Sequence, residues 1–168
     1  EEQRQMVYQR MASLLFTGAR VIEGRGHNVD DITQRLRLEL DLDITSVAHR
    51  EGDSHRLPVP ALAFGLDNRV RLEARQTPMR IGLPERDRFA VRYTLPSGAR
   101  FARLPESFER EHPCMTVRRS VEQEGNEASV VLETVRTCRD IAADAYPEFR
   151  ELVQSTANAL QSGVVFSL

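Results

Sequence analysis

The clearest pattern in the chain is an alternation of apolar and charged residues from position 36 to position 44. Leucine or isoleucine stands at every even position, and arginine, glutamate or aspartate stands at every odd position between them. A period of two places all the apolar side chains on one face of a strand and the charged ones on the other. We therefore predict one long, half-buried strand here, in an antiparallel sheet with one face toward water.

The same alternation recurs in shorter segments. It predicts strands at 19–24, 70–74 and 89–95, and a hairpin with arms at 114–122 and 128–138. A further hairpin turn is predicted at Glu51-Gly52-Asp53. Gly and Pro end most of these runs, which is typical of sandwiches of two antiparallel sheets.

Two segments have a helical period instead. Residues 3–17 carry an apolar stripe, and a second stripe predicts a helix over 145–162. We predict a mainly β chain, an antiparallel β-sandwich with the two helices packed on its edge or end. Residues 1–18 form the N-terminal helix, whose missing N-cap leaves open that it ends a preceding domain. Residues 19–168 form the sandwich domain.

Composition narrows the function classes. The 168 residues carry a net charge of −2 at a pI near 6.1, which argues against a dedicated nucleic-acid binder. The apolar runs are far shorter than the ~18 residues that span a bilayer, so no membrane insertion is expected. All 23 basic residues are arginine. The absence of lysine excludes a Schiff-base lysine and a phosphate-loop lysine, and we expect no cofactor.

The two cysteines fall on the two arms of the last predicted hairpin. A three-residue turn would place Cys114 directly opposite Cys138, whereas a two-residue turn would make them diagonal neighbours. Either arrangement can be bridged if the Cα atoms lie within about 7 Å. With the compartment unknown, two half-buried free thiols are the favoured interpretation.

The other candidate sites are weak. His49 and His55 flank the predicted turn and, with Asp53, would make a loose metal site that lacks a third firm ligand. An arginine face could hold an anionic polymer beside an exposed Tyr93 or Phe101 if its strands were neighbours, although pairing with acidic residues of the sheet is the expectation. Its members are Arg69, Arg71, Arg75, Arg88 and Arg92.

Four short motifs between residues 78 and 150 carry a family resemblance. They are Pro-Met-Arg-Ile-Gly-Leu-Pro at 78–84, Tyr-Thr-Leu-Pro-Ser-Gly at 93–98, Leu-Pro-Glu at 104–106 and Asp-Ala-Tyr-Pro-Glu-Phe-Arg at 144–150. This series resembles the region after the catalytic core of large bacterial transglutaminase-like proteins, which have a domain of unknown function of type 3857 before a papain-like core.

The resemblance implies an accessory module without catalytic residues, since the Cys, His and Asp triad of such proteins lies in the core. It implies a partner in the rest of the same polypeptide or in another subunit. It also implies an envelope or periplasmic location, where a Cys114–Cys138 bridge is more plausible. The alternatives are a stand-alone module for an anionic polymer or envelope glycan, a subunit of an assembly, and an enzyme in which Cys114 and His112 converge.

Overall fold

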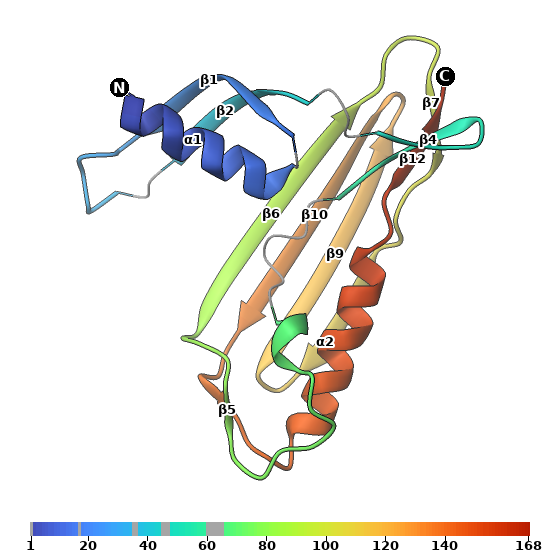
Figure 1. Cartoon of the computed structure of the whole chain (residues 1–168). Helices are drawn as coiled ribbons and strands as arrows, with labels where there is room; N and C mark the ends of the chain where they lie inside the picture. The colour runs from blue at the N-terminus through green and yellow to red at the C-terminus, as the bar shows by residue number, and fades with distance from the viewer. Residues whose placement is uncertain (1, 17, 35–36, 45–47, 60–65) are drawn as a thin grey trace. The chain divides into compact units, whose positions relative to one another are not determined.

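The computed structural model describes residues 2–16, 18–34, 37–44, 48–59 and 66–168 (Figure 1). Contacts divide the chain into two compact units, residues 1–49 and 50–168. The division therefore falls some thirty residues later than the boundary expected after residue 18. The physical reason is that the first helix packs on the hairpin that follows it, so helix and hairpin form one unit.

The first unit is a helix on a two-stranded antiparallel sheet. Its elements are α1 (Glu2–Leu15), β1 (Arg20–His27) and β2 (Arg37–Asp43). Tyr8 and Ala12 of α1 are buried, and the ring of Tyr8 lies where Gly24 and Gly26 leave room on β1. Side chains at these two positions would collide with the ring, so the glycines permit this close approach. The strand predicted over 36–44 is confirmed as β2 from Arg37 to Asp43, and residue 36 lies outside the described residues.

The second unit contains two four-stranded sheets, a two-stranded pair and a helix. Its elements are β3 (His49–Glu51), β4 (Ser54–Leu57), the 3-10 helix η1 (Asp67–Arg69), β5 (Met79–Arg80), β6 (Glu85–Thr94), β7 (Arg100–Arg103), β8 (Phe108–His112), β9 (Met115–Glu124), β10 (Glu127–Arg136), β11 (Asp140–Ile141), α2 (Tyr146–Leu160) and β12 (Val164–Ser167). One sheet has the order β6-β10-β9-β8, the other β3-β4-β12-β7, and β11 pairs with β5. The pairs β1–β2, β6–β10, β9–β10, β8–β9, β5–β11, β4–β12 and β7–β12 are antiparallel.

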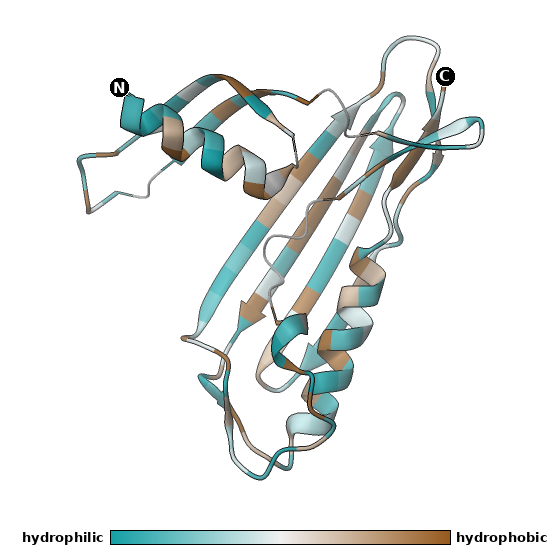
Figure 2. Cartoon of the chain, viewed as in Figure 1, coloured by the Kyte–Doolittle hydropathy of each residue, from teal (hydrophilic) through white to brown (hydrophobic). Residues whose placement is uncertain are grey.

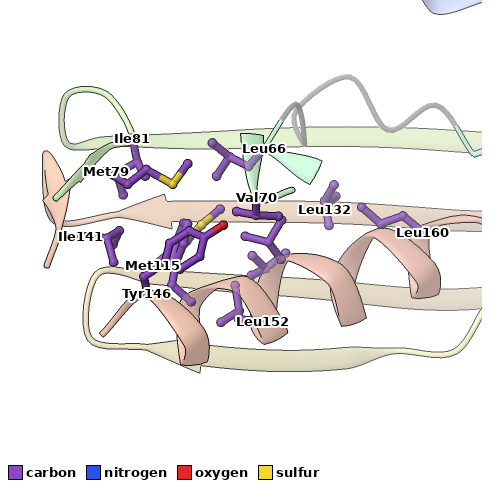
Figure 3. Close-up of a cluster of buried hydrophobic side chains, with 13 residues drawn as sticks. Leu66, Val70, Met79, Ile81, Met115, Leu132, Ile141, Tyr146, Leu152 and Leu160 are labelled. Atoms are coloured by element: carbon purple, nitrogen blue, oxygen red, sulfur yellow. The ribbon is translucent and has the colours of Figure 1, made fainter. Parts of the chain in front are cut away.

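The core lies between α2 and the sheet β6-β10-β9-β8 (Figure 3). From α2 it takes Tyr146, Phe149, Leu152, Val153 and Leu160, and from β9 and β10 it takes Met115, Val117 and Leu132. The spacing on α2 is that of one helical face, and Figure 2 shows alternating apolar and polar bands along the long strands. Pro147 stands in the first turn of α2, where its missing N–H costs no hydrogen bond.

The prediction of a mainly β chain with antiparallel sheets and a helix near each end is confirmed. The layer over the core differs from the predicted sandwich, because α2 and the segment from Leu66 to Ile81 stand opposite β9 and β10. The apolar face of α2, together with side chains from the segment between Leu66 and Ile81, buries the inner face of the sheet as a second sheet would. Neither described helix is long and apolar enough to cross a membrane.

The prediction of a strand at 70–74 is wrong. The 3-10 helix η1 ends at Arg69, and the following residues form bends. Val70 is buried in the core, whereas Leu72 is 55% exposed. The two residues would share a face in a strand, so their different burial shows that the alternation here is not a sheet pattern.

Candidate interaction surface

The sheet β6-β10-β9-β8 has one face turned away from the core, which we call the outer face. The registers place Arg88, Glu133, Arg118 and Glu109 side by side across its four strands. Charges therefore alternate in sign from strand to strand, and opposite charges on facing positions favour this register. The Nε of Arg88 lies 3.3 Å from a carboxylate oxygen of Glu133, so this pair is formed between β6 and β10.

The outer face is hollowed near the β9–β10 turn. A hollow of about 640 Å³ is lined by Arg92, Glu122, Gln123, Glu124, Glu127 and Ser129. Its carboxylates outnumber its single guanidinium, which makes it unsuited to an anionic ligand. Nothing else in the structure indicates what it would hold.

Strand β6 is an edge of this sheet, and within the described residues of its unit no strand pairs with its other side (Figure 1). Leu95, directly after β6, donates its N–H to the carbonyl of Asn126 beside β10. Because hydrogen-bonding direction alternates along an antiparallel strand, the odd-numbered residues of β6 bond to β10. The N–H and C=O groups that point to the free edge belong to Arg86, Arg88, Ala90, Arg92 and Thr94. All five are exposed.

The arginines proposed as one ligand face lie in two separate settings. Arg88 and Arg92 are on the outer face of β6, whereas the other three belong to the segment that is not a strand. There, Arg69 donates to the carbonyl of Arg80 over 2.6 Å and Arg71 donates to Asn68 over 3.0 Å. Arg75 lies 5.2 Å from the centre of the Tyr146 ring. No common strand aligns the five side chains.

The aromatic residue expected beside those arginines lies on the opposite face of β6. Tyr93 is an odd-numbered residue of the strand and points inward, where its hydroxyl donates to the carbonyl of Pro58 over 2.8 Å. Burial raises the pKa of Tyr93 well above its ordinary value, since the charged phenolate would lose its water. Phe101 lies in β7 of the other sheet. The combination of arginines and a stacking ring that a glycan site needs is therefore not assembled here.

The two cysteines are joined in a disulfide, with Cα atoms 4.8 Å apart. Glu124 pairs with Glu127, so the turn between the arms has two residues and the cysteines are diagonal neighbours rather than directly opposite. The bridge closes the end of the hairpin that lies away from the turn. Thr137 adds a hydrogen bond from its N–H to the carbonyl of Cys114.

His112 has a packing environment. Its Nδ1 accepts the backbone N–H of Cys114 over 3.1 Å, and its ring meets the Phe149 ring edge-on at 5.3 Å. Its Nε2 is shielded from solvent and has no hydrogen-bond partner among the described residues. A general base must reach the proton of its nucleophile, and here the sulfur of Cys114 is already bound to Cys138.

The proposed metal ligands are not gathered into a site. The ring of His55 stacks on Phe166, with 5.3 Å between ring centres, while His49 and Asp53 are exposed. Within the described ranges, no three His, Cys, Asp or Glu side chains are grouped to hold a metal ion. The turn itself is found where the sequence predicted it, between β3 and β4.

Sequence reasoning missed two arginines that hold the second unit together, the buried Arg119 and the partly buried Arg136. Arg119 of β9 is 3% exposed and donates to the carbonyls of Glu106 and Ala159, over 2.7 and 2.9 Å, and to the hydroxyl of Ser162. Burial, and to a lesser extent the nearby Arg110, lowers the pKa of the Arg119 guanidinium. Arg136 donates to the carbonyls of Ile81 and Leu83.

The region that matches a known protein family lies inside the second compact unit, residues 50–168. A family model described as "Domain of Unknown Function with solved-structure structure (DUF3858)" matches residues 56–166. A crystal structure described as that of a putative protease from Parabacteroides distasonis ATCC 8503 has a TM-score of 0.57 and 19% sequence identity. The match covers 70% of this chain and 24% of that one, and at this identity it shows the fold alone. No curated protein matches the chain.

Proposed function

Since the chain belongs to the DUF3858 family, a family of domains of unknown function, we propose that it is a non-catalytic accessory module of a longer protein. In this proposal it supports or positions a catalytic core that lies elsewhere in the polypeptide. The structural neighbour is described as a putative protease, and the chain covers only 24% of its length. Most of that protein, and room for a core, therefore lies outside the matched region.

The observation that carries the proposal is that Cys114 and His112 are both engaged in structural contacts. Both cysteines of the sequence are in the disulfide, so no thiolate is present to act as a nucleophile. One ring nitrogen of His112 accepts the backbone N–H of Cys114, and its ring packs on the core residue Phe149. These contacts favour a structural role for the residues that an enzyme hypothesis would need.

The finer part of the proposal names the parent. The motifs at 78–84 and 144–150 resemble those behind the core of bacterial transglutaminase-like proteins, and we carry that parent forward as a proposal. The disulfide supports an oxidising compartment such as the bacterial envelope, because protein disulfides seldom persist in the cytosol. The type 3857 domain expected before such a core is a different family from the one matched.

An activity assay tests the non-catalytic role. The 168-residue chain is incubated with amide and ester substrates and with a thiol-reactive probe, with and without reductant. We expect no turnover in either state, and probe labelling only after reduction. The matched control is His112→Ala. Turnover by the unsubstituted 168-residue chain that is lost in His112→Ala would overturn the proposal, because it would show a catalytic base at that position.

The parent is tested in the source cells. The intact mass and N-terminal sequence of the natively produced polypeptide show whether a Cys, His and Asp core accompanies this chain. If it does, we expect the activity of the whole polypeptide to fall when the module is destabilised, with the core residues unchanged. A native product without such a core would contradict the transglutaminase-like parent.

A further inference from the structure

Among the described residues of its unit, no strand pairs with the far edge of β6, which is ten residues long. The hydrogen bond from Leu95 to Asn126 shows that the backbone groups of five successive even-numbered residues point to this edge. Such an edge is a template for another strand, and short, bulged or covered edges are the usual protection against pairing. Within the described residues of its unit, β6 has a continuous register on β10 without a bulge. The edge is therefore straight enough to accept a partner along its length.

The side chains beside this edge define the chemistry of that partner. Arg86, Arg88 and Arg92 lie on the outer face, and two of them share the single carboxylate of Glu133, at 3.8 and 3.3 Å. Positive charge is therefore in excess on the outer side of the edge at Arg86 and Arg88, whereas Arg92 lies in the hollow among three glutamates. The inward side next to these arginines carries the exposed Asp87 and the half-buried Phe89 and Val91.

A second copy of β6 fits this edge poorly. In an antiparallel pair, directly opposite residues share a face, so the arginines of one copy must face even-numbered residues of the other. The two registers with the greatest overlap place Arg86 against Arg92 or Arg88 against Arg92. Like charges directly opposite each other destabilise a strand pair.

We infer that the β6 edge binds an extended segment of a partner protein, with carboxylates at alternate positions and apolar side chains between them. The backbone of the segment would pair with the even-numbered residues of β6, a mode known as β-strand addition. Its carboxylates would meet Arg86 and Arg88 on the outer face. Its apolar side chains would cover Phe89 and Val91. This inference rests on the proposed role as an interaction module and names the surface used.

The probe is a nine-residue synthetic peptide with glutamate at alternate positions and valine between them. Amide hydrogen exchange of the full chain is measured with and without it. We expect slower exchange at Arg86, Arg88, Ala90, Arg92 and Thr94, and little change at the odd-numbered residues already bonded to β10. A peptide with lysine in place of each glutamate is the matched control, and we expect it to bind at least tenfold more weakly.

Charge reversal separates the edge from the rest of the face. The double variant Arg86→Glu/Arg88→Glu should weaken binding of the glutamate peptide about tenfold or more. Arg118→Glu makes the same kind of change on the interior strand β9 and should leave affinity within about twofold. Near-ultraviolet circular dichroism checks that both variants are folded.

Three outcomes would overturn the inference. They are unchanged exchange at the even-numbered residues, equal binding of the lysine peptide, and protection that rises with protein concentration without peptide. The last would make a second copy the occupant. Failure here leaves the non-catalytic role standing, whereas turnover in the activity assay would overturn that role without bearing on the edge.

Discussion

Arg118 and Arg119 are consecutive in β9, yet their side chains lie on opposite faces of the sheet. Arg118 is exposed on the outer face, while Arg119 is 3% exposed and donates to the carbonyls of Glu106, just before β8, and Ala159, near the end of α2. The carbonyl of Ala159 is among the last of α2, which have no partner within the helix. A planar guanidinium can satisfy several acceptors at once, so Arg119 fastens the end of α2 to the sheet.

Replacing Arg119 by lysine should lower the free energy of unfolding by about 2 kcal/mol, because an ammonium group cannot hold all three acceptors and hydrogen bonds from charged groups are strong. The measurement is equilibrium denaturation in urea. Arg118→Lys is the matched control on the neighbouring residue and should change stability by less than about 0.5 kcal/mol. Equal effects of the two substitutions would contradict the fastening role of Arg119.

Among the elements, the β9–β10 hairpin is the most tightly specified. Ten residues of each strand pair in an unbroken register, the turn has Gly125 at a positive φ of 57°, and the disulfide closes the opposite end. Glycine adopts such a φ without steric cost. The hairpin also supplies Met115, Val117 and Leu132 to the core, so its integrity and that of the core are linked.

The double variant Cys114→Ala/Cys138→Ala should lower the free energy of unfolding by roughly 3 kcal/mol, since it frees a loop with a sequence separation of 24 in the unfolded chain. The variant is compared with the oxidised protein by denaturant unfolding. The untreated protein should gain the mass of two hydrogen atoms on reduction. An unchanged stability, or a protein purified with both thiols free from an oxidising compartment, would contradict this role.

The arms of this hairpin could be predicted from sequence because most of their inward positions are apolar, among them Met115, Val117, Val130 and Leu132. The turn length could not, since Glu-Gly-Asn-Glu suits both a two-residue and a three-residue loop, and the choice decides whether Cys114 and Cys138 are opposite or diagonal. The alternation at 70–74 was misleading because tertiary packing, rather than strand geometry, buries Val70.

One signal for Arg119 was present in the sequence. It stands between Val117 and Val121, at a position where the strand period requires an inward side chain. A charged residue at an inward position is rarely buried without several hydrogen bonds. The acceptors, in contrast, come from Glu106 and Ala159, which are far apart in the sequence, so they could not be identified without the fold.

At the scale of the whole molecule, the chain consists of two compact units, and only the second contains the extended apolar core. Every member of the core cluster, from Leu66 to Leu160, lies in residues 50–168, as does the disulfide. The match to the family model, at residues 56–166, lies within the same unit. This unit therefore has what a domain needs in order to fold alone.

A fragment of residues 50–168 should fold without the first 49 residues. We expect a near-ultraviolet circular dichroism spectrum of fixed aromatic side chains and a cooperative thermal transition, because Tyr146 and Phe149 are fully buried within this unit. A fragment with strand signal but no near-ultraviolet signal would contradict an independent second unit.

The disulfide also has a mechanical consequence. If the chain were pulled from its two ends, force would pass from Cys114 to Cys138 through the sulfur atoms and would bypass β9 and β10. The bypassed segment could not be drawn out, so the fully extended chain would be shorter by about 80 Å than its residue count implies. Reduction would release that length in a single-molecule stretching experiment. An oxidised module of this kind keeps its central hairpin closed under tension.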